Sequence, residues 1–422
     1  MAFSLRCTRC GRVYPADPTA TTCPACDGGP ESPSILEIRQ DTGLGRGSWE
    51  RMLARSPREW GIWRFAEVLP VSGVPRSASG EPVTGGEGDT PLVRAQRLGE
   101  TLGIDLYLKN EAFNPTGSFK DRVAVMVVAK ALEAGAHRLI LSSSGNMAGG
   151  VASLAAAAGL RVTAVVAPET SVAKVAQIRM YGADVVRVGP TETDRLSLCL
   201  EAARRLGWFT ATSPLCPYGS YGAKTMAYEE WSQLAARGAV APDWVVIPVG
   251  YGCNFVGHWK GYLDLQEAGF ISRLPRLVGV QPEGSPSLVR AWEEGREEGI
   301  PGPSDSIAGG ISQTLTLNAR QCLQAMRQTG GMAIAVSDTE MLDAQRELAR
   351  LAGVFAEPSA AAALAGVRKL GGRGVFCLHD RVIAVLTGSG LKDTETALQQ
   401  AGGDAPTIPA RVDALLEVVS PD

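Results

Sequence analysis

Short β-branched runs alternate with alanine-rich segments of helical length along this chain, and no other feature constrains its fold as strongly. The runs are residues 139–141, 162–166, 244–249, 277–280 and 382–386, and the alanine-rich segments are residues 122–134, 148–158, 201–206 and 359–370. Continuous apolar runs are typical of buried parallel strands, and parallel strands need a crossover helix between them. We therefore predict an α/β fold in which helices cover both faces of parallel sheets.

Length and charge narrow the class of protein. A chain of 422 residues is too long for one ordinary core, which suggests two or three domains. A formal net charge of −3 gives no electrostatic reason to expect nucleic acid or a membrane as a partner, so a small-molecule substrate is favoured. The N-terminus lacks the apolar core of a secretory signal and no apolar stretch is long enough for a spanning helix. We expect a cytoplasmic protein.

Four of the nine cysteines lie within the first 26 residues and form a pattern. Cys7 and Cys10 make one Cys-x-x-Cys knuckle, Cys23 and Cys26 make a second, and twelve residues separate them. This spacing is typical of a zinc ribbon, in which four thiolates close the coordination sphere of a structural zinc ion. Redox-active or free cysteines are the alternative. Little around the knuckles is basic, which disfavours a role in nucleic-acid binding.

Three turns rich in Gly, Ser and Asn directly follow predicted strands. They are residues 142–146, 249–254 and 386–390. Ligands of parallel sheets collect where strands end and helices begin, because backbone N–H groups and the helix dipole favour anions there. One such turn is ordinary turn chemistry, but three in one chain favour a binding site.

One lysine stands just inside the start of a predicted helix, in the segment Asn-Pro-Thr-Gly-Ser-Phe-Lys-Asp-Arg of residues 114–122. Taken alone, Lys120 is a solvated helix residue. However, NPTGSFKDR, SSSGN, VGYGCN, EPSAAAALAG and LTGSGLKD follow one another as in threonine synthase and its relatives, and the likeness covers about residues 86–415. The chain thus resembles the fold type II enzymes, which use pyridoxal 5′-phosphate (PLP) and are similar to the tryptophan synthase β-subunit.

The resemblance implies roles for individual residues. Lys120 matches the Schiff-base lysine that also moves protons at the substrate's Cα. Asn146 matches the asparagine that hydrogen-bonds the cofactor's phenolic oxygen, although a helix cap is the alternative for it. Thr387 matches the hydroxyl that faces the pyridine nitrogen. The cofactor phosphate is assigned to Gly250, Tyr251, Gly252, Cys253 and Asn254. The substrate is assigned to Ser143, Ser144, Gly145 and Met147, with supporting roles for Glu357, Ser359 and Ser389.

The resemblance also implies a domain organisation of two doubly wound parallel-sheet domains behind an N-terminal zinc-ribbon segment. We predict the ribbon at residues 1–35, a large PLP-binding domain at 36–124 and 226–415, a small domain at 125–225, and a C-terminal tail at 416–422. Residues 36–90 lack a long periodic stretch and are interpreted as a connecting region. Similar ribbons precede some threonine synthases and cysteate synthases, and the family implies a homodimer.

The chain departs from the threonine synthase pattern where the substrate's phosphate is expected to bind. The arginine of the family's Asn-Ser-x-Asn-Pro-x-Arg segment, aligned with residues 213–219, becomes Gly219. Met147 and Tyr251 replace two further polar contacts, and Ser389 replaces a histidine. Losing a bidentate arginine costs a desolvated dianion far more than a neutral hydrogen bond returns.

We therefore predict PLP-dependent elimination or replacement at Cβ or Cγ of an activated amino acid other than O-phosphohomoserine. Met147, Tyr218 and Tyr251 are expected to shape its less anionic pocket. Thr387 supports this reaction class, because a hydroxyl does not stabilise a protonated pyridine ring and leaves it a moderate electron sink. Threonine synthase itself is the nearest alternative. A non-catalytic scaffold that keeps the fold is the alternative of another class.

Overall fold

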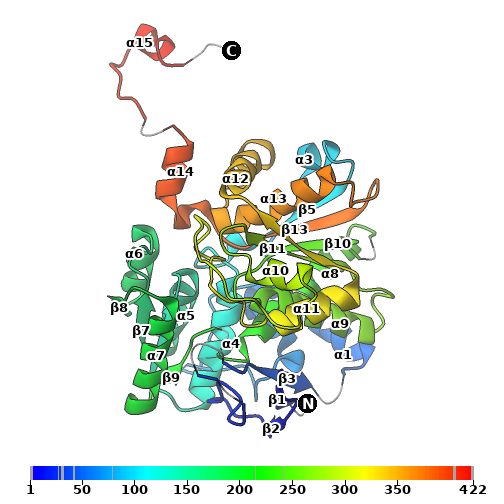
Figure 1. The fold of residues 1–422 in the computed structure, drawn as a ribbon, viewed down its shortest axis with the longest axis vertical. Coiled ribbons are helices and arrows are strands. Elements are labelled where there is room, and N and C mark those ends of the chain that lie inside the picture. The colour runs from blue at the N-terminus through cyan, green and yellow to red at the C-terminus, as the bar shows by residue number, and fades with distance from the viewer. Residues whose placement is uncertain are drawn as a thin grey trace.

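Three sheets organise the computed structural model, which describes residues 3–26, 28–29, 33–40, 43–77, 79–213, 215–239, 241–402 and 405–419 (Figure 1). Two of the sheets are built from parallel strands with helices on their faces, which confirms the predicted fold class. The third is a small antiparallel sheet at the N-terminus.

The larger parallel sheet has the strand order β12-β11-β10-β13-β5-β4. Only the edge strand β4 runs antiparallel to its neighbour. The central strands are buried on both faces, which accounts for their continuous apolar sequences. The bounds are β4 Leu92–Arg94, β5 Asp105–Asn110, β10 Trp244–Pro248, β11 Arg276–Pro282, β12 Met332–Val336 and β13 Arg381–Leu386.

Alternating side chains of β10 enter two separate cores, one on each face of this sheet. Val245 and Ile247 pack with helices on one face, and Trp244 and Val246 pack with helices on the other. The first face is covered by α1 (Arg46–Ala54), η1 (Gly61–Val68), α8 (Gly219–Ala235), α9 (Cys253–Glu267), α10 (Ser287–Glu293) and α11 (Ala319–Thr329). The second is covered by α3 (Gln96–Glu100), α12 (Asp338–Ala352) and α13 (Pro358–Gly372).

The second parallel sheet has the order β8-β7-β6-β9 and lies beside the first (Figure 1). Leu139 and Leu141 of β6 pack with α4 and α5, whereas Ile140 packs with Cys199 of α7 on the opposite face. The strands are β6 (Arg138–Ser143), β7 (Arg161–Val166), β8 (Asp184–Arg187) and β9 (Phe209–Thr210), and the helices are α4 (Lys120–Glu133), α5 (Asn146–Ala158), α6 (Val172–Met180) and α7 (Glu192–Leu206).

The N-terminal sheet joins β1 (Phe3–Cys7), β2 (Val13–Pro15) and β3 (Leu36–Gln40) in the order β2-β1-β3. Because Cys7 pairs with Leu36 and Phe3 with Gln40, this unit continues past the ribbon boundary that we predicted at residue 35. The region 36–90, interpreted as a connection, also contributes α1, α2 (Pro57–Trp60) and η1 to the first face of the large sheet.

The C-terminal part follows η3 (Gly390–Lys392) as α14 (Thr394–Gln400) and α15 (Val412–Leu416). Figure 1 shows this red segment running away from the body of the molecule. Of the predicted tail 416–422, residues 420–422 lie outside the described residues. Among the described helices, none combines the length and apolarity needed to cross a membrane.

Candidate active site

The three glycine-rich turns meet at one cavity of about 520 Å³. One turn follows β6 of the smaller sheet, and the other two follow β10 and β13 of the larger sheet. Each turn contributes lining residues, among them Ser143, Gly252 and Thr387. The volume lies within the range of small-molecule sites, and the position at the carboxyl ends of parallel strands is where such sites form.

Lys120 is the first residue of α4 and the single lysine among the described residues that line the cavity. Burial lowers the pKa of its amine, and this effect is partly opposed by Cys253. The preceding turn is tied down because the Phe119 N–H donates to Thr387 O at 3.0 Å. The Lys120 Nζ lies 4.7 Å from the centre of the Phe119 ring. A partly neutral amine can act as a nucleophile and a base.

Three other lysines that sequence reasoning offers as alternative attachment points are held elsewhere in ion pairs. None of them lines the cavity among the residues described. The pairs are Lys109–Glu229 at 2.8 Å, Lys224–Asp264 at 2.5 Å and Lys260–Glu37 at 2.8 Å.

Asn146 lines the cavity as the first residue of α5. Its Nδ2 donates to Glu357 Oε1 at 2.6 Å, and its buried Oδ1 has no hydrogen-bond partner among the described residues. The helix-cap alternative for Asn146 is wrong, because Ser143 fills that role. The Ser143 Oγ accepts from the N–H groups of Gly145 and Ala148 at 3.0 and 3.1 Å, and its own proton remains available to a ligand.

The turn after β10 leads directly into α9, whose N-cap is Gly252 with φ +95°. A Cβ at Gly252 would lie 2.8 Å from the Cys322 Sγ, so the backbone approaches its neighbours more closely than any side chain permits. Both amide atoms of the buried Asn254 lack a partner within the described structure. A helix N-terminus with unpaired buried amides is suited to an anionic ligand.

A loop that sequence reasoning missed closes another side of the cavity. Residues 304–306 and 309–314 line it, although no strand directly precedes them. The buried Gln313 Oε1 is unpartnered in the described part of the chain. Glu192, at the start of α7, accepts a hydrogen bond from the Tyr251 hydroxyl and one at 3.4 Å from Thr314 Oγ1. Burial raises the pKa of Glu192, against the lowering effect of Tyr251.

The predicted site residues divide into those that line the cavity and those that do not. The expectation that Tyr218 shapes the pocket is wrong, because its hydroxyl donates to Asp17 O in the N-terminal unit at 2.8 Å. Gly145, Gly219 and Ser389 also lie off the lining, and Pro214 of the aligned segment lies outside the described residues. The lining includes Lys120, Ser143, Ser144, Asn146, Met147, Gly250, Tyr251, Gly252, Cys253, Asn254, Glu357, Ser359 and Thr387.

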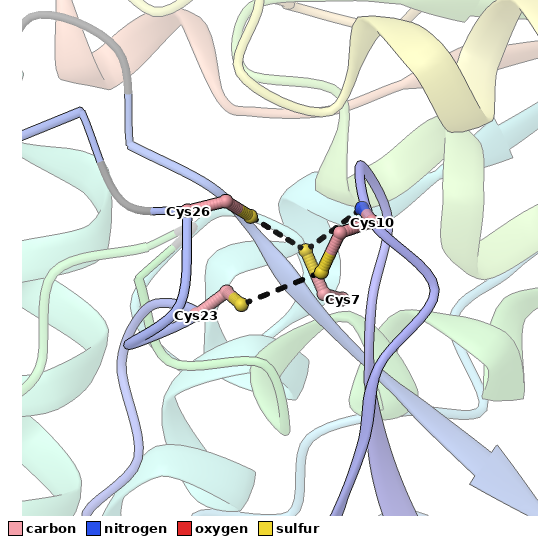
Figure 2. A group of neighbouring side chains, drawn as sticks. All are labelled: Cys7, Cys10, Cys23 and Cys26. Carbon is pink, nitrogen blue, oxygen red and sulfur yellow. Dashed lines mark hydrogen bonds between the residues drawn. The ribbon is translucent and has the colours of Figure 1, made fainter.

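The four N-terminal cysteines come together as their spacing predicts (Figure 2). Their Sγ atoms all lie within 4.8 Å of one another. The Cys7 and Cys26 sulfurs are 3.4 Å apart, and those of Cys10 and Cys23 are 3.8 Å apart. Tetrahedral zinc at about 2.3 Å from each thiolate places sulfurs about 3.8 Å apart. This cluster can therefore hold a metal ion.

Comparison with known proteins places the cavity in a family context. The sequence model of the family described as "Pyridoxal-phosphate dependent enzyme" matches residues 83–388. The threonine synthase of Methanosarcina acetivorans is 35% identical over 99% of this chain and 98% of its own length. That of Methanocaldococcus jannaschii is 36% identical over 93% of this chain and 94% of its own.

Solved structures show the same fold. O-ureido-L-serine synthase matches with a TM-score of 0.64 and 26% identity, over 78% of this chain and 96% of that one. A bacterial threonine deaminase, from T.th., matches with a TM-score of 0.59 and 29% identity, over 71% and 92%. Diaminopropionate ammonia lyase from Escherichia coli, 18% identical with a TM-score of 0.66 over 75% and 88%, supports the fold alone.

Proposed function

The chain belongs to the pyridoxal-phosphate-dependent enzyme family, and from that premise we propose that it catalyses elimination or replacement at Cβ or Cγ of an activated amino acid. The observation that carries the proposal is Lys120, a lysine with a lowered pKa that opens onto a cavity lined by three strand-to-helix turns. PLP supplies an electron sink that stabilises negative charge at the substrate's Cα.

The residues of the cavity fit this cofactor. Asn146 Oδ1, Gln313 Oε1 and both amide atoms of Asn254 are buried without partners among the described residues, as expected where a polar ligand completes their bonds. The N-terminus of α9 at Cys253 suits a phosphate group. We assign covalent attachment to Lys120, ring contacts to Asn146 and Thr387, and the phosphate to residues 250–254.

The chain's own groups then have distinct tasks. The Lys120 amine, held partly neutral by burial, takes and returns the proton at Cα. The hydroxyls of Ser143 and Ser144 bind the substrate carboxylate, together with the turn that carries them. The loop 304–314 limits the access of water, which would otherwise compete in a replacement reaction.

We further propose that the substrate is not O-phosphohomoserine. Met147 brings a thioether rather than a hydroxyl to the cavity wall. Tyr251 hydrogen-bonds the carboxylate of Glu192, which also lines the cavity. An acidic group on the wall disfavours a phosphate dianion in its neighbourhood.

Threonine synthase remains the second candidate, because relatives of that name are 35 to 36% identical over nearly the whole chain. A specific residue favours it as well. Arg195 lines the cavity and donates from Nη1 to Val188 O at 3.2 Å, which leaves further guanidinium hydrogens for an anion.

Steady-state assays with two matched variants separate these candidates. Wild-type enzyme loaded with PLP is tested with O-phosphohomoserine and with a panel of amino acids, for release of phosphate, ammonia or a keto acid. We expect weak turnover of O-phosphohomoserine that rises in Glu192→Gln and changes little in Arg195→Gln. Efficient production of threonine and phosphate by the wild type, lost in Arg195→Gln, would establish threonine synthase activity instead.

The remaining assignments are also proposals. We assign structural zinc to the cysteine cluster, and we keep the predicted domain boundaries and the homodimer as predictions. A non-catalytic scaffold would give purified protein with no visible absorbance band even after PLP is added. We expect a visible band at one PLP per chain.

A further inference from the structure

A buried carboxylate joins the two parallel sheets directly beside the cavity. Glu357, 2% exposed, precedes α13 of the larger sheet. It accepts the Asn146 Nδ2 at 2.6 Å and pairs with the Lys174 Nζ at 3.2 Å. Asn146 begins α5 and Lys174 lies on α6, and both helices belong to the smaller sheet. One carboxylate of the larger sheet therefore holds two helices of the smaller one.

The surrounding backbone is shaped to admit this pair. A Cβ at Gly145 would lie 2.6 Å from the Lys174 Cδ, so the lysine stem crosses the turn that precedes Asn146. A Cβ at Gly388 would lie 2.4 Å from the Glu357 Oε1. Any side chain at either glycine would displace the ion pair. Two of the three glycine-rich turns thus owe a glycine to the Lys174–Glu357 pair rather than to the cavity itself.

The chemistry of Glu357 fixes how Asn146 is oriented. An ionised carboxylate accepts hydrogen bonds and cannot donate one, so the amide nitrogen of Asn146, not its oxygen, must face Glu357. Lys174, only 10% exposed, keeps the carboxylate ionised by supplying the opposite charge. The amide's second N–H and its unpartnered Oδ1 are then held in one arrangement beside the cavity.

A second lysine close to Glu357 does not replace Lys174. Lys392 interacts with Glu357 over a longer range, and its Nζ donates to the Gln177 Oε1. Asp121 also attracts Lys392. Lys174 is therefore the cation in direct contact with Glu357, within the described part of the chain.

We propose that Glu357 and Lys174 are positioning residues that lock the Asn146 amide in the orientation needed at the cofactor ring. The pair also ties this contact to the relative placement of the two sheets, because its two members come from different sheets. The inference rests on the proposed function, since Asn146 contacts the ring only if PLP binds in this cavity.

The test uses full-length enzyme and PLP itself as the probe. The variants are Glu357→Gln, Lys174→Gln and the conservative Lys174→Arg, with Arg179→Gln as an exposed control on the same helix. Two readouts do not depend on turnover: the PLP dissociation constant and the visible absorbance spectrum as a function of pH. Glutamine at 357 can present either amide atom to Asn146, so we expect its affinity for PLP to fall about tenfold or more and its spectral pKa to shift.

The variants give distinguishable outcomes. Lys174→Gln is expected to follow Glu357→Gln, whereas Lys174→Arg and Arg179→Gln are expected to stay close to wild type. If Lys174→Gln fails to fold, the charge-balanced Lys174→Gln/Glu357→Gln variant takes its place and is expected to show the same spectral shift. Wild-type spectrum and affinity in the glutamine variants, or equal loss in Lys174→Arg and Lys174→Gln, would overturn the inference. Absence of a PLP band in the wild type would instead overturn the proposed function and this inference with it.

Discussion

Replacing Glu229 with glutamine is expected to destabilise the protein by about 3 to 5 kcal/mol, because it unbalances a buried charge network under the helix that carries Lys120. The network contains two cations, Lys109 and Arg122, and two carboxylates, Glu111 and Glu229, each at most 1% exposed on its side chain. Glu229 accepts from Arg122 Nη1 and Nη2 at 2.7 and 2.6 Å and from Lys109 Nζ at 2.8 Å. Its loss as a charge leaves one buried cation uncompensated.

The pH dependence of this effect has a defined sign. Burial alone would raise the pKa of Glu229, but Arg122 and Lys109 hold it below its usual value. A lowered pKa in the folded state means that the stabilisation is complete above the unfolded pKa of about 4.3 and is lost as the pH falls below it. The gap in stability between wild type and Glu229→Gln should therefore be constant near neutral pH and narrow below about pH 4.

Equilibrium urea unfolding followed by tryptophan fluorescence measures this loss. Glu201→Gln, which breaks the exposed pair with Arg205, is the matched control and should cost less than about 0.5 kcal/mol. The double variant Lys109→Met/Glu229→Gln restores the charge balance and should recover part of the loss. A cost below about 1 kcal/mol for Glu229→Gln, or no recovery in the double variant, would refute the reasoning.

Two further predictions concern the metal cluster and the turn before α9. The Cys7→Ser/Cys10→Ser variant should lose its zinc by metal analysis while PLP stays bound, and unchanged zinc content would refute the assignment of the ligands. Gly252→Ala should weaken PLP binding at least tenfold, because its Cβ would press against the Cys322 Sγ at 2.8 Å. Gly269→Ala, with positive φ but open space, should lose some stability and keep its PLP affinity; equal affinities would show that the close approach is unimportant.

The parallel sheets could be predicted because their central strands are buried on both faces. The apolar runs at 139–141 and 244–249 correspond to β6 and β10, since tertiary packing there agrees with the local pattern. Strand β5 was missed because it carries Lys109 and Asn110, which are buried in polar networks that no local pattern reveals. Strand β8 was missed because most of its side chains are not buried.

The candidate site was predictable where chemistry follows a strand and unpredictable where it arrives from elsewhere. The turns after β6, β10 and β13 share a cavity, as the topology of parallel sheets requires. The loop 304–314 and Glu192 follow no such rule, and tertiary packing alone brings them to the cavity. The alignment placed Tyr218 at the pocket, but the start of α8 turns its hydroxyl toward Asp17. Sequence spacing does not fix the direction in which a side chain points.

The central claim is that Lys120 carries the cofactor. Borohydride reduction of the PLP-loaded enzyme, followed by mass spectrometry of its peptides, locates the attachment point directly. We predict one pyridoxyl group per chain on the peptide that contains Lys120, and none in the Lys120→Ala variant, which should fold because alanine is a good helix former at the start of α4. A reduced group on Lys109, Lys224 or Lys260, or wild-type labelling of Lys120→Ala, would contradict the account.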